Sequence, residues 1–464
     1  MNRKIYIKER LVIDILKAAL LLVLSFGIYY IWTRYYNPYI PKPFWRLGNY
    51  LIGVIFGAVY LFLAQTYGGF MIGTSTSGDI IYSHGICIVF SLSLTYVIFS
   101  LVSYRLVNAL PFIAIFAVYF SIAVLWTYMT DRIYFLIHPP RKTVLIYDNV
   151  ESYISLKGIK SMERRFDVVS TIRSRDVELH DIYKIIRTVD AAFLCGVPAD
   201  YRNEIVKFCI RYNKVVYIKP KISDTIIRGG KTIQISNVPV FRCTRSNPKL
   251  FYTVSKRVLD IVIAGIGAIA LSPIMLVTAI AIKAYDKGPV LYKQTRLTKN
   301  GKEFKVWKFR SMKVDAEKDG VARLAAENDD RITPIGSFIR KLRIDEIPQV
   351  FNVLGGSMSI VGPRPERPEI AKQYEENMPE FALRLQVKAG LTGYAQIYGK
   401  YNTPPYDKVQ MDLIYVATQS FLVDLKLILM TVKILFMKES TEGIAGDQVT
   451  AEMVDAQQQI DENE

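Results

Sequence analysis

Four long apolar stretches near the start of the chain constrain its fold more than any other feature. They cover residues 11–32, 48–64, 80–103 and 109–131, and a helix of about 20 residues crosses a hydrocarbon core of ~30 Å. With 51% hydrophobic and 22% charged residues, the 464-residue chain is neither disordered nor fibrous. The sequence therefore predicts a membrane protein whose residues 1–137 form a bundle of four transmembrane helices, followed by a large water-exposed part.

The charges that flank these stretches predict which side of the membrane the ends face. The N-terminal tail MNRKIYIKER carries four Lys or Arg residues, and the chain after the fourth stretch continues with Arg141 and Lys142. By the positive-inside rule, both ends of the block are expected in the cytoplasm. The loop after the first stretch is also basic, which does not fit this orientation. The even number of helices fits it, because four spans return the chain to the side it left.

Residues 141–245 follow a different pattern, in which short apolar runs alternate with helix-period stretches. TVLIY, FDVVSTI, DAAFLCG and KVVYIKP are expected as buried strands, with helices between them. This alternation is typical of a parallel, Rossmann-like α/β domain. The turn after the first run, YDNVE, contains no glycine, so we do not expect a dinucleotide site there. A regulatory and a purely architectural role both stay open.

The four cysteines and three histidines give little support for disulfide or zinc chemistry. Cys87, Cys195, Cys209 and Cys243 fall in no CxxC or other ligand spacing. We expect all four as small buried hydrophobic side chains in a reducing compartment.

A further apolar stretch, residues 261–282, is interrupted by Ser272 and Pro273. A proline removes one helical hydrogen bond and kinks the helix, and a neighbouring serine hydroxyl can bind the freed carbonyl. A straight span would carry the basic remainder of the chain across the membrane, against the charge rule. We therefore expect a re-entrant membrane helix over residues 258–283, kinked at Ser272 and Pro273. An ordinary fifth span is the alternative.

The sharpest chemical signal is the stretch RITPIGSFIRKLRIDEIPQVFNVL, in which apolar residues recur at helical spacing before the adjacent acids Asp345 and Glu346. Adjacent side chains on a helix diverge by about 100°, so we expect two separate tasks rather than a shared proton. One carboxylate can attack phosphorus, and the other can ligate a Mg²⁺ ion that bridges a diphosphate. A solvated acidic pair near a helix end is the alternative.

Basic and glycine-rich motifs follow these acids. In MSIVGPRPERPE, two prolines fix the backbone around Arg364, and a preorganised guanidinium suits phosphate binding. In KAGLTGYAQIYGK, Gly390 and Gly393 allow tight turns near a ligand. The net charge of +17 suits anionic lipid or a phosphorylated ligand. Nucleic acid is not expected as a partner, because no nucleic-acid module accompanies the charge.

Taken in order, several motifs resemble the bacterial sugar transferase family, the monotopic polyprenyl-phosphate phosphoglycosyl transferases. They are KRVLD, the Ser272-Pro273 run, YKQTR, KFRSM, RKLRIDEIPQVFNVLGGSMSIVGPRP and AGLTGYAQIYG. The resemblance implies a mainly α-helical catalytic domain over residues 251–440. The four helices and the Rossmann-like domain ahead of it resemble the large members, polyprenyl glycosylphosphotransferases that initiate capsule, exopolysaccharide or O-antigen assembly.

The resemblance also implies an activity and a location. Hexose-1-phosphate would pass from a UDP-sugar to undecaprenyl phosphate, releasing UMP, through a covalent aspartyl phosphosugar. Mg²⁺ would be the cofactor. The catalytic domain would lie on the cytoplasmic face of the bacterial inner membrane, among its phospholipids. A homodimer stays open, as do the polysaccharide and the identity of the hexose: glucose, galactose or an N-acetylated sugar.

Residue roles follow from the same resemblance. Asp345 matches the nucleophile and Glu346 the Mg²⁺ ligand. The matched substrate-binding positions are Arg340, Arg364, Lys308, Arg310, Gln396 and Tyr394. Tyr394 stands where many members have tryptophan, a departure that bears on nucleotide or sugar preference more than on the reaction.

The C-terminal region contains two further patterns. Residues 421–437 combine a broad apolar face with Asp424, Lys426 and Lys433, which favours a helix lying in the membrane interface over a span. Residues 441–464 carry acidic residues and neither Lys nor Arg, so we expect a disordered acidic tail.

Two other functions stay open. A membrane-anchored UDP-sugar dehydratase would also join four spans to a Rossmann-like domain, and Tyr252 and Lys256 could form its Tyr/Lys pair. That pair lies outside the Rossmann-like segment, which lacks the nucleotide glycines. The other alternative is a non-enzymatic regulator or scaffold of polysaccharide export, against which Asp345, Glu346 and Arg364 argue.

Overall fold

The computed structural model describes residues 3–149, 152–153, 156, 162–313, 331–399 and 403–435. The expected acidic tail at 441–464 lies outside the described residues. The chain forms two compact units, the first over Met1–Lys219 and the second over Pro220–Glu464. The middle domain was expected to extend to residue 245, but the first unit ends at Lys219.

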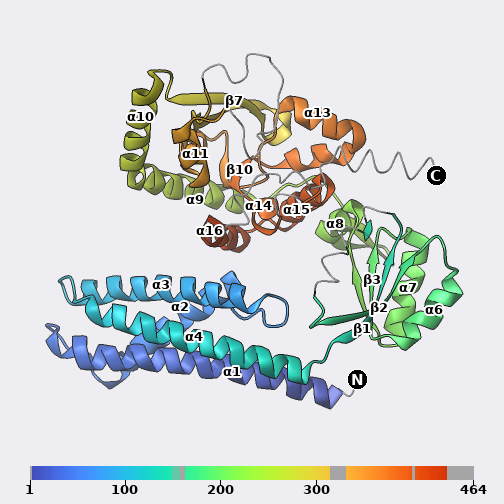
Figure 1. The fold of residues 1–464 in the computed structure, drawn as a ribbon, viewed down its shortest axis with the longest axis horizontal. Coiled ribbons are helices and arrows are strands. Elements are labelled where there is room, and N and C mark those ends of the chain that lie inside the picture. Colours follow the sequence, from blue (N-terminus) through green and yellow to red (C-terminus); the bar gives the residue numbers. More distant parts are fainter. Residues whose placement is uncertain are drawn as a thin grey trace. The chain divides into compact units, whose positions relative to one another are not determined.

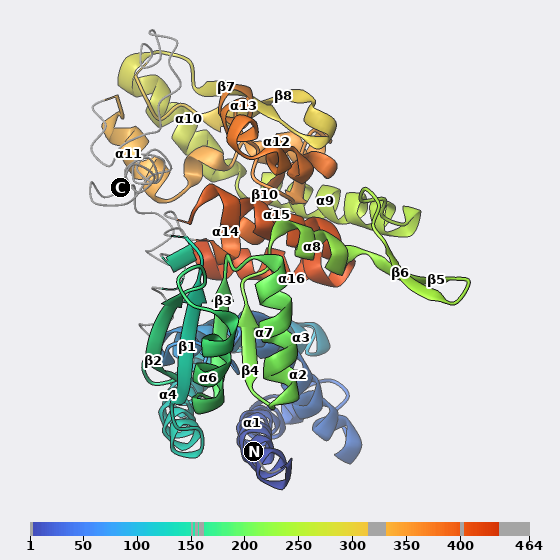
Figure 2. The same ribbon diagram turned by 90° about the vertical axis from the view of Figure 1, so that its right-hand side faces the viewer.

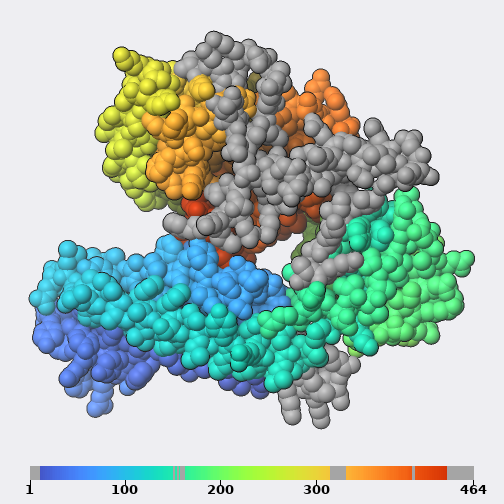
Figure 3. Space-filling view, viewed as in Figure 1, coloured from blue at the N-terminus to red at the C-terminus, as the bar shows by residue number. Residues whose placement is uncertain are grey.

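The first unit begins with the predicted apolar helices. Among the described residues, four helices are long and apolar enough to cross a membrane. Each packs against its neighbours, with α1 also contacting α4, and they form one continuous block in the space-filling view (Figure 3). Their bounds are α1 Arg3–Ile31, extended by short helical turns to Tyr39, α2 Arg46–Tyr67, α3 Ser77–Val102 and α4 Leu110–Ile137.

Aromatic side chains fill the centre of this helical block, while its outer surface is apolar. Trp32, Tyr60 and Tyr119 are fully buried, whereas Leu22 and Leu101 are about 70% exposed. A helix that is apolar on all sides is typical of a membrane span. The described structure thus confirms the four predicted apolar helices.

A four-stranded sheet completes the first unit, as the strand and helix pattern predicted. Its strands lie in the order β2-β1-β3-β4, and every pairing is parallel. Helices α6 and α7 pack on one face through Ile182 and Ile205 (Figure 2). The elements are β1 Arg141–Tyr147, β2 Phe166–Arg173, α6 Leu179–Thr188, β3 Ala191–Cys195, α7 Ala199–Arg211 and β4 Val215–Ile218.

The carboxyl end of β1 is occupied by an ion pair. Asp148 is buried, accepts hydrogen bonds from Arg175 and Ser174, and follows Tyr147 directly. Burial would raise the pKa of Asp148, but the bonds from Arg175 and Ser174 outweigh it and lower that pKa. A dinucleotide fold needs glycine at this turn, so that its backbone can approach a pyrophosphate.

The second unit combines helices with three two-stranded sheets in its described part. Its helices are α8 Ile222–Gly229, α9 Leu250–Ala270, α10 Ser272–Asp286, α11 Pro334–Lys341, α12 Gln349–Leu354, α13 Pro368–Asn377, α14 Tyr394–Tyr398, α15 Pro405–Thr418 and α16 Phe421–Leu435. Its strands are β5 Lys231–Ile235, β6 Val238–Arg242, β7 Leu291–Leu297, β8 Glu303–Phe309, β9 Ser359–Val361 and β10 Gly390–Thr392. Short 3₁₀ segments lie at Lys299–Gly301, Ile344–Glu346 and Pro379–Gln386.

The segment after Lys219 belongs to the second unit because its apolar side chains are buried there. Ile222 of α8 lies in a core with Phe381 and Leu413. The β5–β6 hairpin then leads to Cys243, which is exposed, whereas the other three cysteines are buried. The expectation that all four are buried is therefore wrong for Cys243, since an isolated hairpin has no layer to cover it.

Helices α9 and α10 meet at a bend of 57°, visible in Figure 1. The Ser272 hydroxyl donates to the carbonyl of Ile269 at 2.7 Å, as expected for a serine beside a helix-breaking proline. Apolar side chains on both sides of the bend are exposed, among them Ile269 at 78% and Val277 at 66%.

Polar residues in the middle of α9 hold this helix to the rest of the second unit. Arg257 donates to the carbonyls of Val353 and Leu354 at the end of α12, each at 2.7 Å. Asp260 is buried and accepts from the hydroxyl of Ser359 and the amide of Ile360. Polar side chains in the middle of α9 therefore anchor this helix, and no charged residue follows Asp260 before its end at Ala270.

Strands β9 and β10 lie so close together that Gly390 of β10 and Gly362, just after β9, leave no room for a side chain. A Cβ atom on Gly390 would come within 2.1 Å of the backbone nitrogen of Gly362 and 2.6 Å of its Cα atom. No rotamer can relieve a clash with backbone. Gly390, which was expected near a ligand, thus allows the close approach of two strands.

We predict that Gly390→Ala destabilises the second unit by about 1–3 kcal/mol, the typical cost of overpacking. Gly267→Ala is the matched control, because a Cβ atom there meets no neighbour within 4 Å and alanine favours a helix. Thermal unfolding should show a lower midpoint for the first variant only. Equal midpoints would contradict the tight strand contact.

Candidate active site

The two acids of the strongest motif lie on a tight turn between α11 and α12. Helix α11 ends at Lys341, and Arg343 has a left-handed backbone with φ of +55°. This residue reverses the chain, and Asp345 and Glu346 follow on a 3₁₀ turn. We expected both acids on a regular helix, which is wrong because α11 stops before them. Neighbouring side chains still diverge, by about 120° in a 3₁₀ turn.

Two cations hold the Glu346 carboxylate. Its Oε1 atom accepts from Lys308 Nζ of β8 and from Arg364 Nη2 of the loop after β9, each at 2.9 Å. Burial would raise the pKa of Glu346, but Arg364 and Lys308 outweigh it and keep that pKa well below its usual range. Glu346 is therefore ionised, with its charge offset by two donors.

Asp345 has a different environment from its neighbour. Burial and the charge of Glu346 raise the pKa of Asp345 to about 6, against the opposing effect of Lys308, Arg340 and Arg364. Lys308 and Arg364 make their ion pairs with Glu346 rather than with Asp345. The two acids thus differ in basicity although they are adjacent in sequence, as a nucleophile and an electrostatic partner would.

The predicted phosphate contact Arg310 lies in a buried position. Its Nη2 atom pairs with Asp286, the last residue of α10, and a Cβ atom on Gly288 would lie 2.4 Å from its Nη1 atom. In this structure Arg310 joins the end of α10 to the end of β8. A phosphate-binding role for Arg310 stays a prediction.

Tyr394 and Gln396 of α14 make local contacts. The ring of Tyr394 packs against that of Tyr398 at 4.8 Å, and Gln396 Nε2 donates to the carbonyl of Leu391 at 2.9 Å. The first contact lies within α14, and the second joins α14 to β10. Substrate binding by Tyr394 and Gln396 stays a prediction.

Comparison with known proteins bears on this part of the chain. The profile of the bacterial sugar transferase family matches residues 251–438. A UDP-glucose:undecaprenyl-phosphate glucose-1-phosphate transferase of Caulobacter vibrioides is 39% identical over 190 residues, which are 40% of this chain and 71% of that relative. The chain belongs to the bacterial sugar transferase family.

Two further relatives show how far the similarity extends. A UDP-glucose:undecaprenyl-phosphate glucose-1-phosphate transferase of Klebsiella pneumoniae is 42% identical over 223 residues, 47% of this chain and 48% of the relative. A UDP-N-acetylgalactosamine-undecaprenyl-phosphate N-acetylgalactosaminephosphotransferase of Aeromonas hydrophila is 39% identical over 240 residues, 51% of this chain and 56% of the relative. The match spans about half the length of these two relatives.

All the predicted site residues of this family member lie within the matched segment. Asp345, Glu346, Lys308 and Arg364 come together around one turn. The part of the chain that the structure describes contains no cluster of three or more His, Cys, Asp or Glu side chains that could hold a metal. Mg²⁺ commonly binds one or two carboxylates together with substrate phosphates, and the ionised Glu346 fits a site of that kind.

Two buried ion pairs, those of Asp424 and Asp412, were not predicted from the sequence. Asp424 was expected on the polar side of an interfacial helix, but it is 1% exposed and accepts from Tyr252, Lys256 and Tyr415. Asp412, also 1% exposed, was not singled out. A lone acid within an apolar run was the sequence signal that could have indicated these pairs. Such an acid is on a buried face, and acids are seldom fully buried unless they are paired.

Proposed function

We propose that this chain transfers hexose-1-phosphate from a UDP-sugar to undecaprenyl phosphate with release of UMP, as the initiating membrane step of capsule, exopolysaccharide or O-antigen assembly. The observation that carries the proposal is the difference between two adjacent acids. Asp345 has a raised pKa and makes no ion pair with Lys308 or Arg364, whereas Glu346 pairs with both. The names of the relatives from Klebsiella, Caulobacter and Aeromonas support the donor and acceptor classes.

The two environments support Asp345 as the nucleophile. A carboxylate held by two cations is stabilised in its charged form and attacks poorly, whereas one with a raised pKa keeps its basicity and is still mostly ionised at neutral pH. An oxygen of Asp345 attacks the β-phosphorus of the UDP-sugar, and the bond from that phosphorus to UMP breaks. The phosphate of the lipid then attacks the same phosphorus and releases Asp345.

The surrounding cations offset the negative charge that accumulates on the diphosphate. Lys308 and Arg364 lie within 2.9 Å of Glu346, and Arg340 acts on Asp345 through its charge. Glu346, together with donor phosphate oxygens, would hold Mg²⁺, which when bound adds positive charge at the leaving group.

We also propose that α9 and α10 form a re-entrant helix on the cytoplasmic face of the bacterial inner membrane. The bend of 57°, the Ser272 bond and the exposed apolar side chains near the bend support this arrangement. A lipid phosphate lies at the headgroup level, so a helix that enters and leaves by one face keeps the site at that level.

This topology predicts that both ends of the bent helix pair face the same side. Cys243 is exposed ahead of α9, and Lys283→Cys in a Cys243→Ser background marks the end of α10. A membrane-impermeant maleimide should label both in inside-out vesicles and neither in sealed right-side-out vesicles. Labelling of the two cysteines from opposite sides would contradict the re-entrant helix.

For the sheet of the first unit we propose a Rossmann-like domain without a dinucleotide site, because Asp148 and Arg175 pair at the turn that would need glycine. The dehydratase alternative loses its catalytic pair, since Tyr252 and Lys256 both bind Asp424. NAD recovered from the purified protein would support that alternative.

Assay of UMP release tests the proposed function. Purified protein is incubated with undecaprenyl phosphate, Mg²⁺ and, separately, the UDP forms of glucose, galactose, N-acetylglucosamine and N-acetylgalactosamine. At least one donor should give UMP in an amount that depends on the lipid. Failure of all four donors would favour the non-enzymatic alternative.

A further inference from the structure

The loop between β9 and α13 places the Arg364 side chain next to Glu346. Hydrogen bonds fix the backbone of this loop at successive residues. Two prolines on either side of Arg364 fix their own φ angles. Four consecutive carbonyls of the loop then accept hydrogen bonds. These bonds are Pro363 from the amide of Gly390 at 2.9 Å, Arg364 from Arg384 Nη2 at 2.8 Å, Pro365 from Arg296 Nη1 at 3.2 Å and Glu366 from the amide of Leu297 at 2.9 Å.

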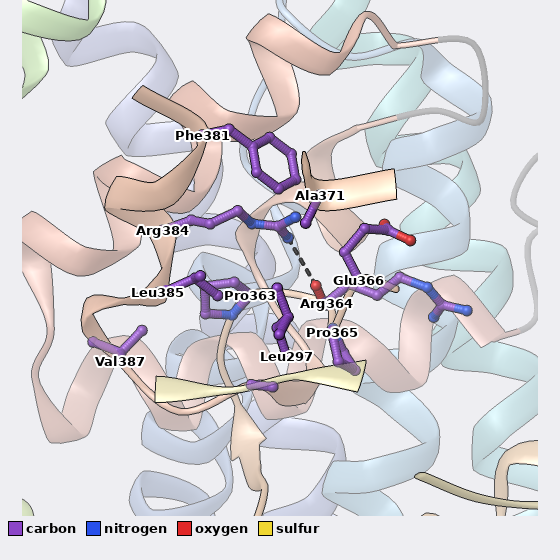
Figure 4. Close-up of a pocket in the computed structure, with 11 residues that line it drawn as sticks. Leu297, Pro363, Arg364, Pro365, Glu366, Ala371, Phe381, Arg384, Leu385 and Val387 are labelled. Carbon is purple, nitrogen blue, oxygen red and sulfur yellow. Dashed lines mark hydrogen bonds between the residues drawn. The ribbon is translucent and has the colours of Figure 1, made fainter. Parts of the chain in front are cut away.

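The donor to Arg364 itself is a buried charged side chain. Arg384, only 7% exposed, comes from the 3₁₀ segment Pro379–Gln386. Its Nη2 atom pairs at 2.7 Å with Oδ2 of Asp412 of α15, and its guanidinium lies 4.9 Å from the ring centre of Phe381. Figure 4 shows this guanidinium pointing to the carbonyl of Arg364.

The Arg384–Asp412 ion pair is an energetically costly hydrogen-bond donor for the single carbonyl of Arg364. Moving charges out of water costs several kcal/mol per ion, and a well-packed apolar pair is often as stable. The Arg364 side chain is 48% exposed, so burial alone does not fix its position. The cavity between Arg364, Arg384 and Phe381 measures about 10 Å³, room for about one water molecule. Arg384 therefore fills most of the space beside the Arg364 backbone.

We propose that Arg384, held by Asp412, is a positioning residue that fixes the backbone of Arg364 and thereby keeps its guanidinium at Glu346. This inference rests on the proposed function, because a fixed Arg364 guanidinium matters only if the diphosphate of a UDP-sugar binds beside it. Arg384 acts through Arg364 and does not itself contact the Glu346 carboxylate in the described structure.

A double-mutant cycle tests this coupling. Arg384→Lys keeps a cation for Asp412, but a single ammonium cannot reproduce the planar fork of the guanidinium. We expect it to lower kcat/KM for UMP release about tenfold in the wild-type background and less than about twofold in an Arg364→Gln background. The midpoint of thermal unfolding of Arg384→Lys should lie only a few degrees below that of the wild type. Equal losses in both backgrounds, or no loss in the wild type, would overturn the proposal.

Two further variants keep the test decisive. Arg257→Lys is the matched control, since this arginine is also a donor to backbone carbonyls, but to two at the end of α12. Its effect should therefore add to that of Arg364→Gln. If Arg384→Lys does not fold, Asp412→Asn enters the same cycle with the same expectation. A wild-type protein that releases no UMP from any donor would refute the proposed function, whereas an active wild type with additive losses would refute only the role of Arg384.

Discussion

Asp345→Asn is expected to abolish the covalent phosphosugar and to lower the rate of UMP release by at least about 10³-fold, because an amide has no nucleophilic oxygen anion. Asparagine has nearly the same volume as aspartate, and the ion pairs of the turn belong to Glu346. The fold of the site should therefore survive the change.

The measurement uses a UDP-sugar labelled at the β-phosphorus, with the protein denatured and separated after incubation without acceptor. Wild-type protein should retain the label and the variant should not. A fully active, labelled Asp345→Asn protein would show that another group attacks the phosphorus.

Glu346→Gln is expected to lower activity by about 10²-fold and to raise the Mg²⁺ concentration needed for half-maximal rate. The change leaves Lys308 and Arg364 without the carboxylate that lies 2.9 Å from each, and removing one partner of a half-buried ion pair is costly. It also removes a hard oxygen ligand from the proposed Mg²⁺ site.

Glu366→Gln is the matched control for this second prediction. Glu366 also pairs with an arginine, Arg296 at 3.0 Å, but not with Lys308. Its amide variant should leave the Mg²⁺ requirement unchanged. Titration of UMP release with Mg²⁺ compares the two variants, and an identical Mg²⁺ dependence in Glu346→Gln and the wild type would contradict the ligand role.

Hydrophobic periodicity was enough to predict the elements of the first unit. The four apolar stretches became α1 to α4, and the alternating runs became a parallel sheet, because burial on a helix or strand leaves a regular pattern. The kink at Ser272 was predictable for the same kind of local reason, since proline acts on its own turn.

Features that depend on contacts between distant residues were not predictable in this way. The left-handed backbone of Arg343 is uncommon outside glycine, so no residue type indicated that the helix ends before Asp345. Asp424 looked like part of a polar helix face until its partners from α9 and α15 were known. The pairing of Arg384 with Asp412 likewise joins two segments with no motif in common.

The most direct test of the proposed mechanism is a two-step measurement of UMP. Purified protein is mixed with Mg²⁺ and the active UDP-sugar, and undecaprenyl phosphate is added only after UMP has stopped accumulating. We predict a first release of about one UMP per active site, because Asp345 is then occupied, followed by continuous turnover once the lipid arrives. Release of UMP only when donor and lipid are present together would contradict a covalent intermediate on Asp345.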